Sequence, residues 1–94
     1  MRSRYAAYVV EAADYLRESW HPDTRPSRIR FQADQKWLGL KIKACAGGLD
    51  DDSHGTVEFV ARYKIAGKAH RLHEISEFRR IEDRWYYHSG QHLD

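Results

Sequence analysis

The sequence has 94 residues, of which 41% are hydrophobic, 13% aromatic and 32% charged, and its formal net charge is +2 at pH 7. This length predicts one domain, residues 1–94, and the aromatic content excludes a disordered chain. The weak net charge argues against a dedicated nucleic-acid binder, which carries a denser cluster of Lys and Arg. The nearest such cluster, Arg25, Arg28 and Arg30, is interpreted as a solvated loop.

Cys45 is the single cysteine of the chain. One thiol can form neither an internal disulfide nor a thiolate zinc site, which fits a reducing compartment. The stretch MRSRYAAYVV has no long apolar run and no small-residue cleavage site, so it predicts neither a signal peptide nor a membrane span. We expect a cytoplasmic protein with no membrane partner and no cofactor.

Apolar residues recur every three or four positions between residues 3 and 20, which predicts an amphipathic helix. Asp14, a good N-cap, could restart the helix after a short break. Pro22 predicts its end, because the residue before a proline is pushed to extended geometry. Residues 21–36 show no clear period and predict a long irregular connection.

From residue 37 the period changes to two, the alternation of a β-strand, and short turns divide the rest of the chain. One helical region followed by such a series predicts an α+β fold, with N-terminal helices packed on one face of an antiparallel meander. The expected strands are residues 37–44, 56–64, 71–80 and 84–90.

Alternation also assigns the side chains of the sheet to two faces. The outer face offers an apolar stripe, and exposed apolar patches often mark interfaces, so a homodimer through this face is one hypothesis. Scattered surface residues are the alternative. The stripe consists of Trp37, Val60, Ile75 and Tyr86. The helix-covered face is expected to carry Leu38, Leu40, Ile42, Val57, Phe59, Tyr63, Leu72, Phe78, Trp85 and Tyr87.

In the stretch RLHEISEF, Glu74 and Ser76 alternate with apolar residues of the covered face. An isolated ionised carboxylate in an apolar core costs more than a small domain can spare, so it must be paired, neutralised or hydrated. Two interpretations stay open. Glu74 either pairs with Arg4 or His21 as a structural tie, or lies in a pocket as a general acid/base or ligand acceptor.

Four further residues are candidates for the same pocket. Trp20 ends the predicted helix and His21 follows it, and His21 could relay a proton to or from Glu74. Tyr63 and Tyr87 point inward, and each could present its hydroxyl group to a ligand. The alternative for each is structural: core packing for the rings, and backbone hydrogen bonds for the histidine.

The stretch HRLHE does not predict a zinc site. His70 and His73 are three positions apart on a predicted strand and face opposite sides of the sheet. The acidic run at 50–52 lacks the loop spacing of a calcium site. We therefore expect no metal site in this chain.

Four stretches in order resemble the central domain of the YchJ family of uncharacterised bacterial proteins. They are MRSRYAAYV at 1–9, ADYLRESWHPDTRP at 13–26, VEFVARYK at 57–64 and LHEISEFRRIEDRWYYHSG at 72–90. The resemblance implies a nuclear transport factor 2-like, or cystatin-like, cone, in which a curved antiparallel sheet wraps N-terminal helices around a cavity. That superfamily includes SnoaL-like enzymes as well as binding and dimerisation domains, so the fold alone does not fix the function.

Typical family members carry cysteine-rich, zinc-binding SEC-C segments beside this domain. These 94 residues contain no such segment, as would a naturally short form, a chain with a misplaced start or an excised domain. No zinc-dependent role of the family is therefore carried over to them. The leading hypothesis is a non-catalytic pocket for a small-molecule ligand. The alternatives are a SnoaL-like acid/base enzyme using Glu74 and His21, and a protein-interaction or dimerisation module. The expected pocket residues are Trp20, His21, Tyr63, Glu74, Ser76 and Tyr87.

Overall fold

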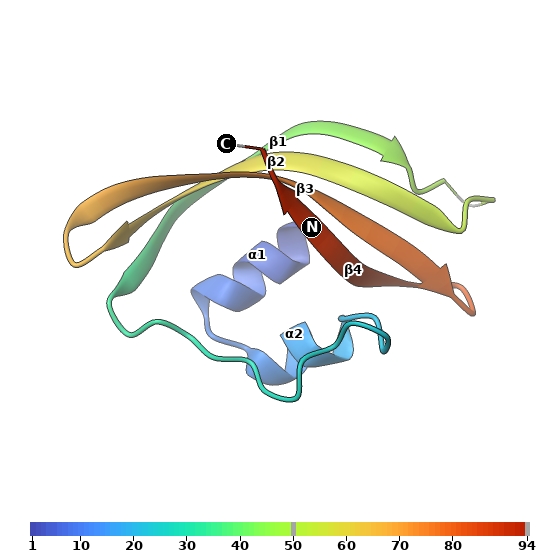
Figure 1. Ribbon diagram of the computed structural model, residues 1–94, viewed down its shortest axis with the longest axis horizontal. Coiled ribbons are helices and arrows are strands. Elements are labelled where there is room, and N and C mark those ends of the chain that lie inside the picture. Colours follow the sequence, from blue (N-terminus) through green and yellow to red (C-terminus); the bar gives the residue numbers. More distant parts are fainter. Residues whose placement is uncertain (50, 94) are drawn as a thin grey trace.

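The computed structural model of the chain describes residues 1–49 and 51–93. Two helices, α1 (Arg2–Val9) and α2 (Ala13–Glu18), precede the strands β1 (Gln35–Gly47), β2 (His54–Ile65), β3 (Lys68–Ile81) and β4 (Arg84–His92). The strands form an antiparallel sheet in the order β1-β2-β3-β4, which arches over the helices (Figure 1). The predicted α+β meander is therefore confirmed, with each strand longer than predicted. Neither helix of the described part is long and apolar enough to cross a membrane.

The helical region is divided by a sharp turn. Glu11 has a φ of 56°, a left-handed conformation that a non-glycine residue rarely adopts, and this ends the first helix. Asp14 is not the N-cap of α2, which is Ala12 without a side-chain bond. Asp14 lies instead in the first turn, where its charge favours the helix N-terminus. The second helix ends before Trp20, which pairs with Tyr87 in a parallel bridge.

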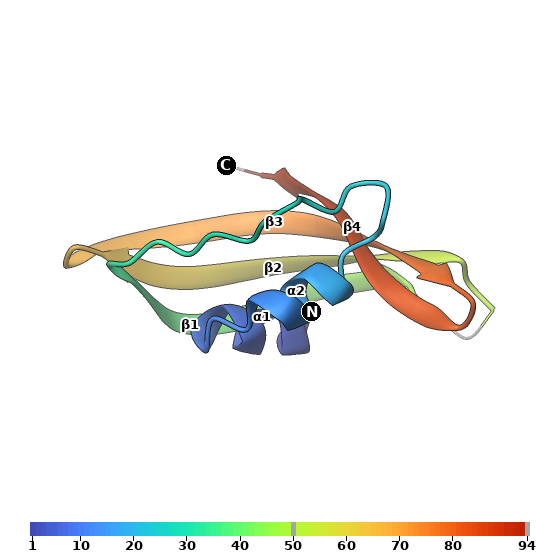
Figure 2. The ribbon, with the colours of Figure 1, turned by 90° about the horizontal axis from the view of Figure 1, so that it is seen from below.

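Residues 19–21 therefore add a short extended segment to the edge of β4. The Tyr87 N–H donates to the Ser19 carbonyl at 2.8 Å, and the His21 N–H donates to the Tyr87 carbonyl at 2.6 Å. Thr24 continues the attachment, since its hydroxyl donates to the His88 carbonyl at 2.6 Å. The connection to β1 then passes on the helix side of the sheet (Figure 2).

Two bulges interrupt the alternation of β1, one after Trp37 and one after Ile42. A bulge adds one residue to one strand, so the two-residue period does not hold across it. Trp37 consequently faces α1, where its ring lies 5.7 Å from Tyr5 and 6.0 Å from Tyr8. Its predicted place in the outer stripe was wrong. Leu38, predicted on the covered face, is instead 49% exposed.

The buried apolar core of the described residues is small. The helices contribute Ala7 and Leu16, and β2 contributes Phe59, Val60 and Ala61. Three polar residues are also buried. Buried polar groups are costly without hydrogen bonds, so the partners of these residues indicate what each one does. They are Arg4, His21 and Ser76.

Candidate functional site

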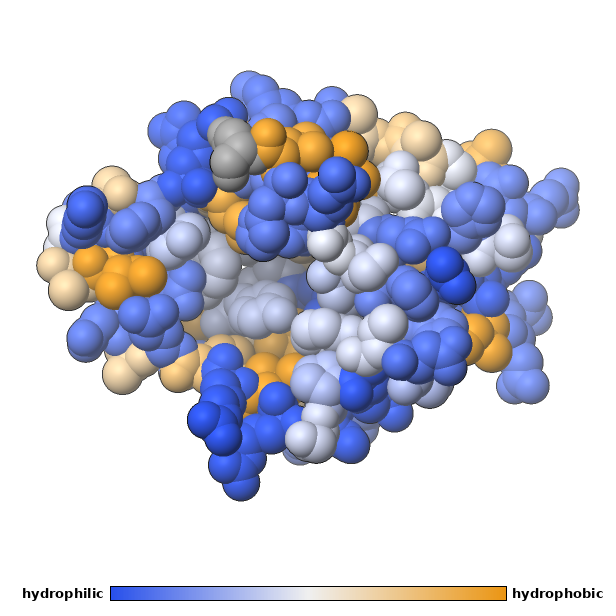
Figure 3. Space-filling model, viewed as in Figure 1, coloured by the Kyte–Doolittle hydropathy of each residue, from blue (hydrophilic) through white to orange (hydrophobic). Residues whose placement is uncertain are grey.

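A cavity of about 220 Å³ lies between α1 and the covered face of the sheet. Figure 3 shows the molecule hollowed in this region, between the sheet and the helical layer. Two charged residues, Arg4 and Glu74, border the cavity among apolar neighbours. The rest of the wall consists of Met1, Tyr5, Tyr8, Trp37, Phe59, Ala61, Leu72 and Tyr87.

Glu74 lies on the covered face of β3, and its side chain is 13% exposed. The fully buried Ser76 donates its hydroxyl hydrogen to Glu74 Oε2 at 2.7 Å. On the other oxygen, His92 Nε2 lies 3.9 Å from Oε1. Among the described residues, the Glu74 carboxylate is thus held by Ser76 and faces His92. The sequence had suggested Arg4 or His21 as its partner instead.

Because Gly90 of β4 has no side chain, the Glu74 carboxylate can occupy the space beside it. Gly90 pairs with Ser76 across the β3–β4 ladder. A Cβ on residue 90 would lie 2.6 Å from the carboxyl carbon of Glu74 and 2.9 Å from its Oε1. Gly90 has no signal in the sequence that predicts this role, because only the register of β3 and β4 reveals the contact.

Arg4 ties α1 to the rest of the fold from beneath the sheet. It is 4% exposed, and its Nη1 donates to the Leu16 carbonyl at 3.0 Å and to Ser19 Oγ at 2.6 Å. Its guanidinium carbon also lies 4.4 Å from the centre of the Tyr87 ring and 5.0 Å from that of Trp20. These contacts are structural, because they join both helices to β4.

Tyr87 contacts Arg4 and also lines the cavity. Its ring packs edge-on against Trp20 at 4.9 Å and against Phe78 at 5.8 Å between centroids. Burial raises the pKa of Tyr87 to about 12, and the negative charge of Glu74 adds to this effect while Arg4 opposes it. At neutral pH Tyr87 therefore presents a neutral phenol to the cavity, which Glu74 also borders.

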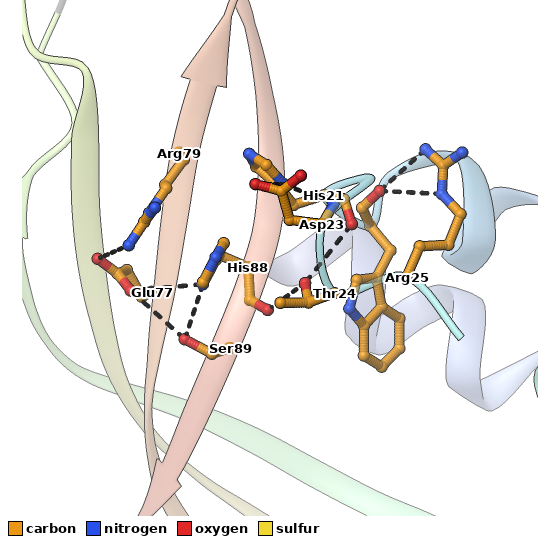
Figure 4. Close-up of polar contacts among 9 residues, drawn as sticks. His21, Asp23, Thr24, Arg25, Glu77, Arg79, His88 and Ser89 are labelled. Carbon is orange, nitrogen blue, oxygen red and sulfur yellow. Dashed lines mark hydrogen bonds and ion pairs between the residues drawn. The ribbon is translucent and has the colours of Figure 1, made fainter.

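His21 does not line this cavity. It lies near His88 of β4 (Figure 4). It is 8% exposed; its Nδ1 accepts the Asp23 N–H at 3.0 Å, and its ring lies 5.0 Å from that of His88. His88 in turn faces Glu77, with Nδ1 and Oε2 3.6 Å apart. The hollow that His21 borders contains Glu77 and not Glu74, so the structure does not bring the predicted proton pair together.

The other predicted residues are divided between the cavity and its support. Tyr63 stacks on His70 at 5.2 Å and packs against Trp37 at 5.3 Å, so it touches a wall residue without lining the cavity. Trp20 supports Tyr87, and its indole nitrogen is buried without a hydrogen-bond partner among the described residues. Of the six predicted residues, those that line or hold the cavity's polar end are Glu74, Ser76 and Tyr87.

A second hollow of about 270 Å³ shares two wall residues, Tyr8 and Trp37, with the first and extends toward Phe31. Within the described residues, no group of three or more His, Cys, Asp or Glu side chains is placed to hold a metal ion. Of the acidic run at 50–52, Asp50 lies outside the described residues.

Comparison with known proteins adds the family context. Residues 1–90 match the family described as YchJ, middle NTF2-like domain. The UPF0225 protein of Bordetella pertussis is 58% identical over 91 residues, which cover 96% of this chain and 67% of that protein. The UPF0225 protein of Chromobacterium violaceum is 52% identical over 93 residues, covering 96% and 69%. The solution structure of a SEC-C motif containing protein from Rhodopseudomonas palustris superimposes with a TM-score of 0.83 at 34% identity, covering 100% of this chain and 76% of that one.

Proposed function

The chain belongs to the YchJ family, as its middle NTF2-like domain, and on this premise we propose that it binds a small, mainly apolar ligand in the cavity between α1 and the sheet. The observation that carries the proposal is a partly enclosed carboxylate at the end of an aromatic cavity. Pockets for small molecules combine this kind of apolar wall with a few placed polar groups.

The size and lining of the cavity indicate the class of ligand. Its volume of about 220 Å³ is below the range of roughly 300–1,000 Å³ that is typical for drug-sized ligands, so a compact molecule is expected. Glu74 is an acceptor, and the rings of Tyr5 and Tyr8 offer π faces nearby. A ligand with an apolar body and an ammonium or other donor group would satisfy both features.

Binding is proposed rather than catalysis by the predicted Glu74–His21 pair because of where His21 lies. A proton relay requires two groups within hydrogen-bond reach, directly or through one water. Glu74 and His21 border different hollows, and the hydrogen bonds of each go to other residues. The pair therefore gives no support to the acid/base mechanism that the SnoaL-like enzymes suggested.

Native mass spectrometry of the freshly purified chain, beside a denaturing run, is the experiment that tests this function. We expect a small-molecule adduct that is lost on denaturation, with a mass that identifies the ligand. Addition of benzylamine, an apolar ring carrying one ammonium group, should shift the amide resonances of Leu72 and Glu74 in a heteronuclear NMR spectrum.

Two Leu→Phe variants locate the bound molecule. Leu72→Phe places a ring in the cavity and should abolish both the adduct and the benzylamine shifts. Leu38→Phe makes the same change at an exposed position of β1 and should leave both intact. A bare mass together with an unchanged spectrum would contradict the proposal, as would an adduct that survives Leu72→Phe.

A further inference from the structure

The second hollow, of about 270 Å³, is bordered by charged residues of its own. It lies between the end of α1, the connection before β1 and the start of β1, all of which lie toward the left of Figure 1. Both signs of charge and several aromatic rings meet there. The charged residues are Glu11, Arg30 and Lys36, and the rings are those of Tyr8, Phe31 and Trp37.

The three rings form one aromatic wall. The Tyr8 ring is central, since its centroid lies 6.0 Å from that of Trp37 and 6.3 Å from that of Phe31. All three residues are only partly buried. Aromatic surface left in this state is stabilised when an apolar group covers it. The wall is therefore suited to the apolar side chain of a ligand.

The three charged residues border the same hollow without neutralising one another. All three are exposed, and among the described residues none of their side chains forms an ion pair or a hydrogen bond. The Glu11 carboxylate therefore lies more than 4.0 Å from the cationic nitrogens of both Arg30 and Lys36. A small molecule that carries both charges can contact both signs of this rim at once.

Glu11 is held at the rim by its backbone. Its N–H donates to the Tyr8 carbonyl at 3.3 Å, and its φ of 56° is a left-handed conformation. That conformation costs free energy in a residue with a Cβ, and glycine avoids the cost. Strained residues of this kind cluster at ligand clamps. A contact between the Glu11 carboxylate and a ligand would offset the cost.

Two amides complete the polar part of the lining, those of Gln32 and Gln35. The Gln35 N–H donates to the Gln32 carbonyl at 3.2 Å, so a turn brings both residues to the hollow. A side-chain amide offers donors and an acceptor together. These two groups can therefore bind a carboxylate as well as an ammonium group.

We propose that the second hollow binds a free α-amino acid with an apolar side chain. The carboxylate of the ligand contacts Arg30 and Lys36, its ammonium group contacts Glu11, and its side chain lies on the aromatic wall. A simple amine or a simple carboxylic acid would leave one sign of the rim unpaired. The site is separate from the first cavity, because neither Leu72 nor Glu74 borders the second hollow.

A heteronuclear NMR titration of the isotope-labelled chain with L-phenylalanine tests this assignment. We expect saturable shifts of the backbone amides of Gln32 and Gln35, and the same shifts in Leu72→Phe, whose first cavity is filled. Phenylalaninamide lacks the carboxylate and phenylpropionate lacks the ammonium group. Each should bind about two- to fivefold more weakly than L-phenylalanine, as expected for the loss of one exposed ion pair.

Single variants connect each charge of the ligand to its partner. Arg30→Gln should weaken L-phenylalanine by about two- to fivefold and leave phenylalaninamide unchanged. Glu11→Gln should weaken L-phenylalanine equally and leave phenylpropionate unchanged. Glu11→Gly should weaken binding and also raise the midpoint of thermal unfolding, because the left-handed strain is removed. Arg28→Gln and Asp34→Asn are matched controls, since both residues are exposed in the same connection and neither borders the hollow.

Four results would overturn the proposal. The first is the absence of saturable shifts at Gln32 and Gln35. The second is equal affinity for L-phenylalanine, phenylalaninamide and phenylpropionate, which would assign the contact to the rings alone. The third is equal affinity of the wild type, Arg30→Gln and Glu11→Gln for L-phenylalanine. The fourth is loss of the shifts in Leu72→Phe, which would place the amino acid in the first cavity. Circular dichroism of each variant checks that the fold is retained.

Discussion

The Glu74 carboxylate of β3 occupies the space that a side chain at Gly90 of β4 would need. A Cβ at position 90 would stand 2.6 Å from both the carboxyl carbon and Oε2 of Glu74. Real Cβ atoms do not approach heavy atoms so closely, so any side chain at position 90 must displace the carboxylate. The polar end of the cavity thus depends on the absence of a side chain on the neighbouring strand.

Gly90→Ala should therefore move the carboxylate away from Ser76. We expect a loss of about 1 kcal/mol in the free energy of unfolding, from local overpacking, and weaker binding of the cavity ligand. Gly39→Ala is the matched control, because a Cβ there has no neighbour within 4 Å. Chemical denaturation of both variants measures the difference, and equal stability of the two would contradict the contact.

Ser76→Ala should cost more stability than Glu74→Gln. Removing the Ser76 hydroxyl leaves a largely buried carboxylate without its 2.7 Å donor, at a cost of about 1–3 kcal/mol. In Glu74→Gln the amide oxygen can still accept that hydrogen bond and no charge is buried, so the change should be below about 1 kcal/mol. Thermal and denaturant unfolding compare them, with the exposed Ser27→Ala as control. A larger loss for Glu74→Gln would make Glu74 a structural tie.

Arg4→Lys should destabilise the fold even though the charge is kept. The planar guanidinium binds Leu16 and Ser19 while lying over the Tyr87 ring, and an ammonium group cannot reproduce this combination. We expect a loss of about 2–3 kcal/mol, as for broken hydrogen bonds to a buried charged group. Arg2→Lys makes the same change at an exposed position of α1. Similar unfolding midpoints for the two variants would refute the role given to Arg4.

Stability should decrease in alkaline solution because of Tyr87. Its pKa rises from 10.0 to about 12 on folding, so the unfolded chain loses this proton first as the pH increases. The contribution of the neutral phenol is fully present below pH 10 and is lost as the pH rises through about 12. Burial raises the pKa of Tyr5 in the same direction. Tyr87→Phe should flatten the profile of unfolding free energy against pH over this range, whereas the exposed Tyr15→Phe should leave it unchanged.

The position of Glu74 was predictable because β2 and β3 pair without a bulge along the whole of their ladder. Alternation counted from Leu72 therefore stays in phase through Ser76. The same count failed in β1, where the bulge after Trp37 turned that ring toward α1 and left Leu38 exposed. A bulge depends on pairing with a neighbouring strand and has no local pattern in this sequence.

The error about His21 has a different origin. Its place after the helix was predicted, but the helix ends early and the following residues pair with β4. That pairing joins residues 66 positions apart in the chain, and it turns His21 toward His88 rather than toward Glu74. The pairing of Arg62 with Arg71 is hidden for the same reason, since these residues face each other only across two strands.

The attachment of residues 19–21 to β4 also bears on the order in which this chain folds. Helices of eight and six residues are too short to persist alone in water, so they require their tertiary contacts. The ring and the carbonyl that hold this segment both belong to Tyr87, near the C-terminal end of the sheet. During synthesis on the ribosome the two helices are made before the sheet and must therefore wait for β4. Helical circular dichroism should accordingly be among the latest signals to recover in refolding, after the hairpins of the sheet have closed.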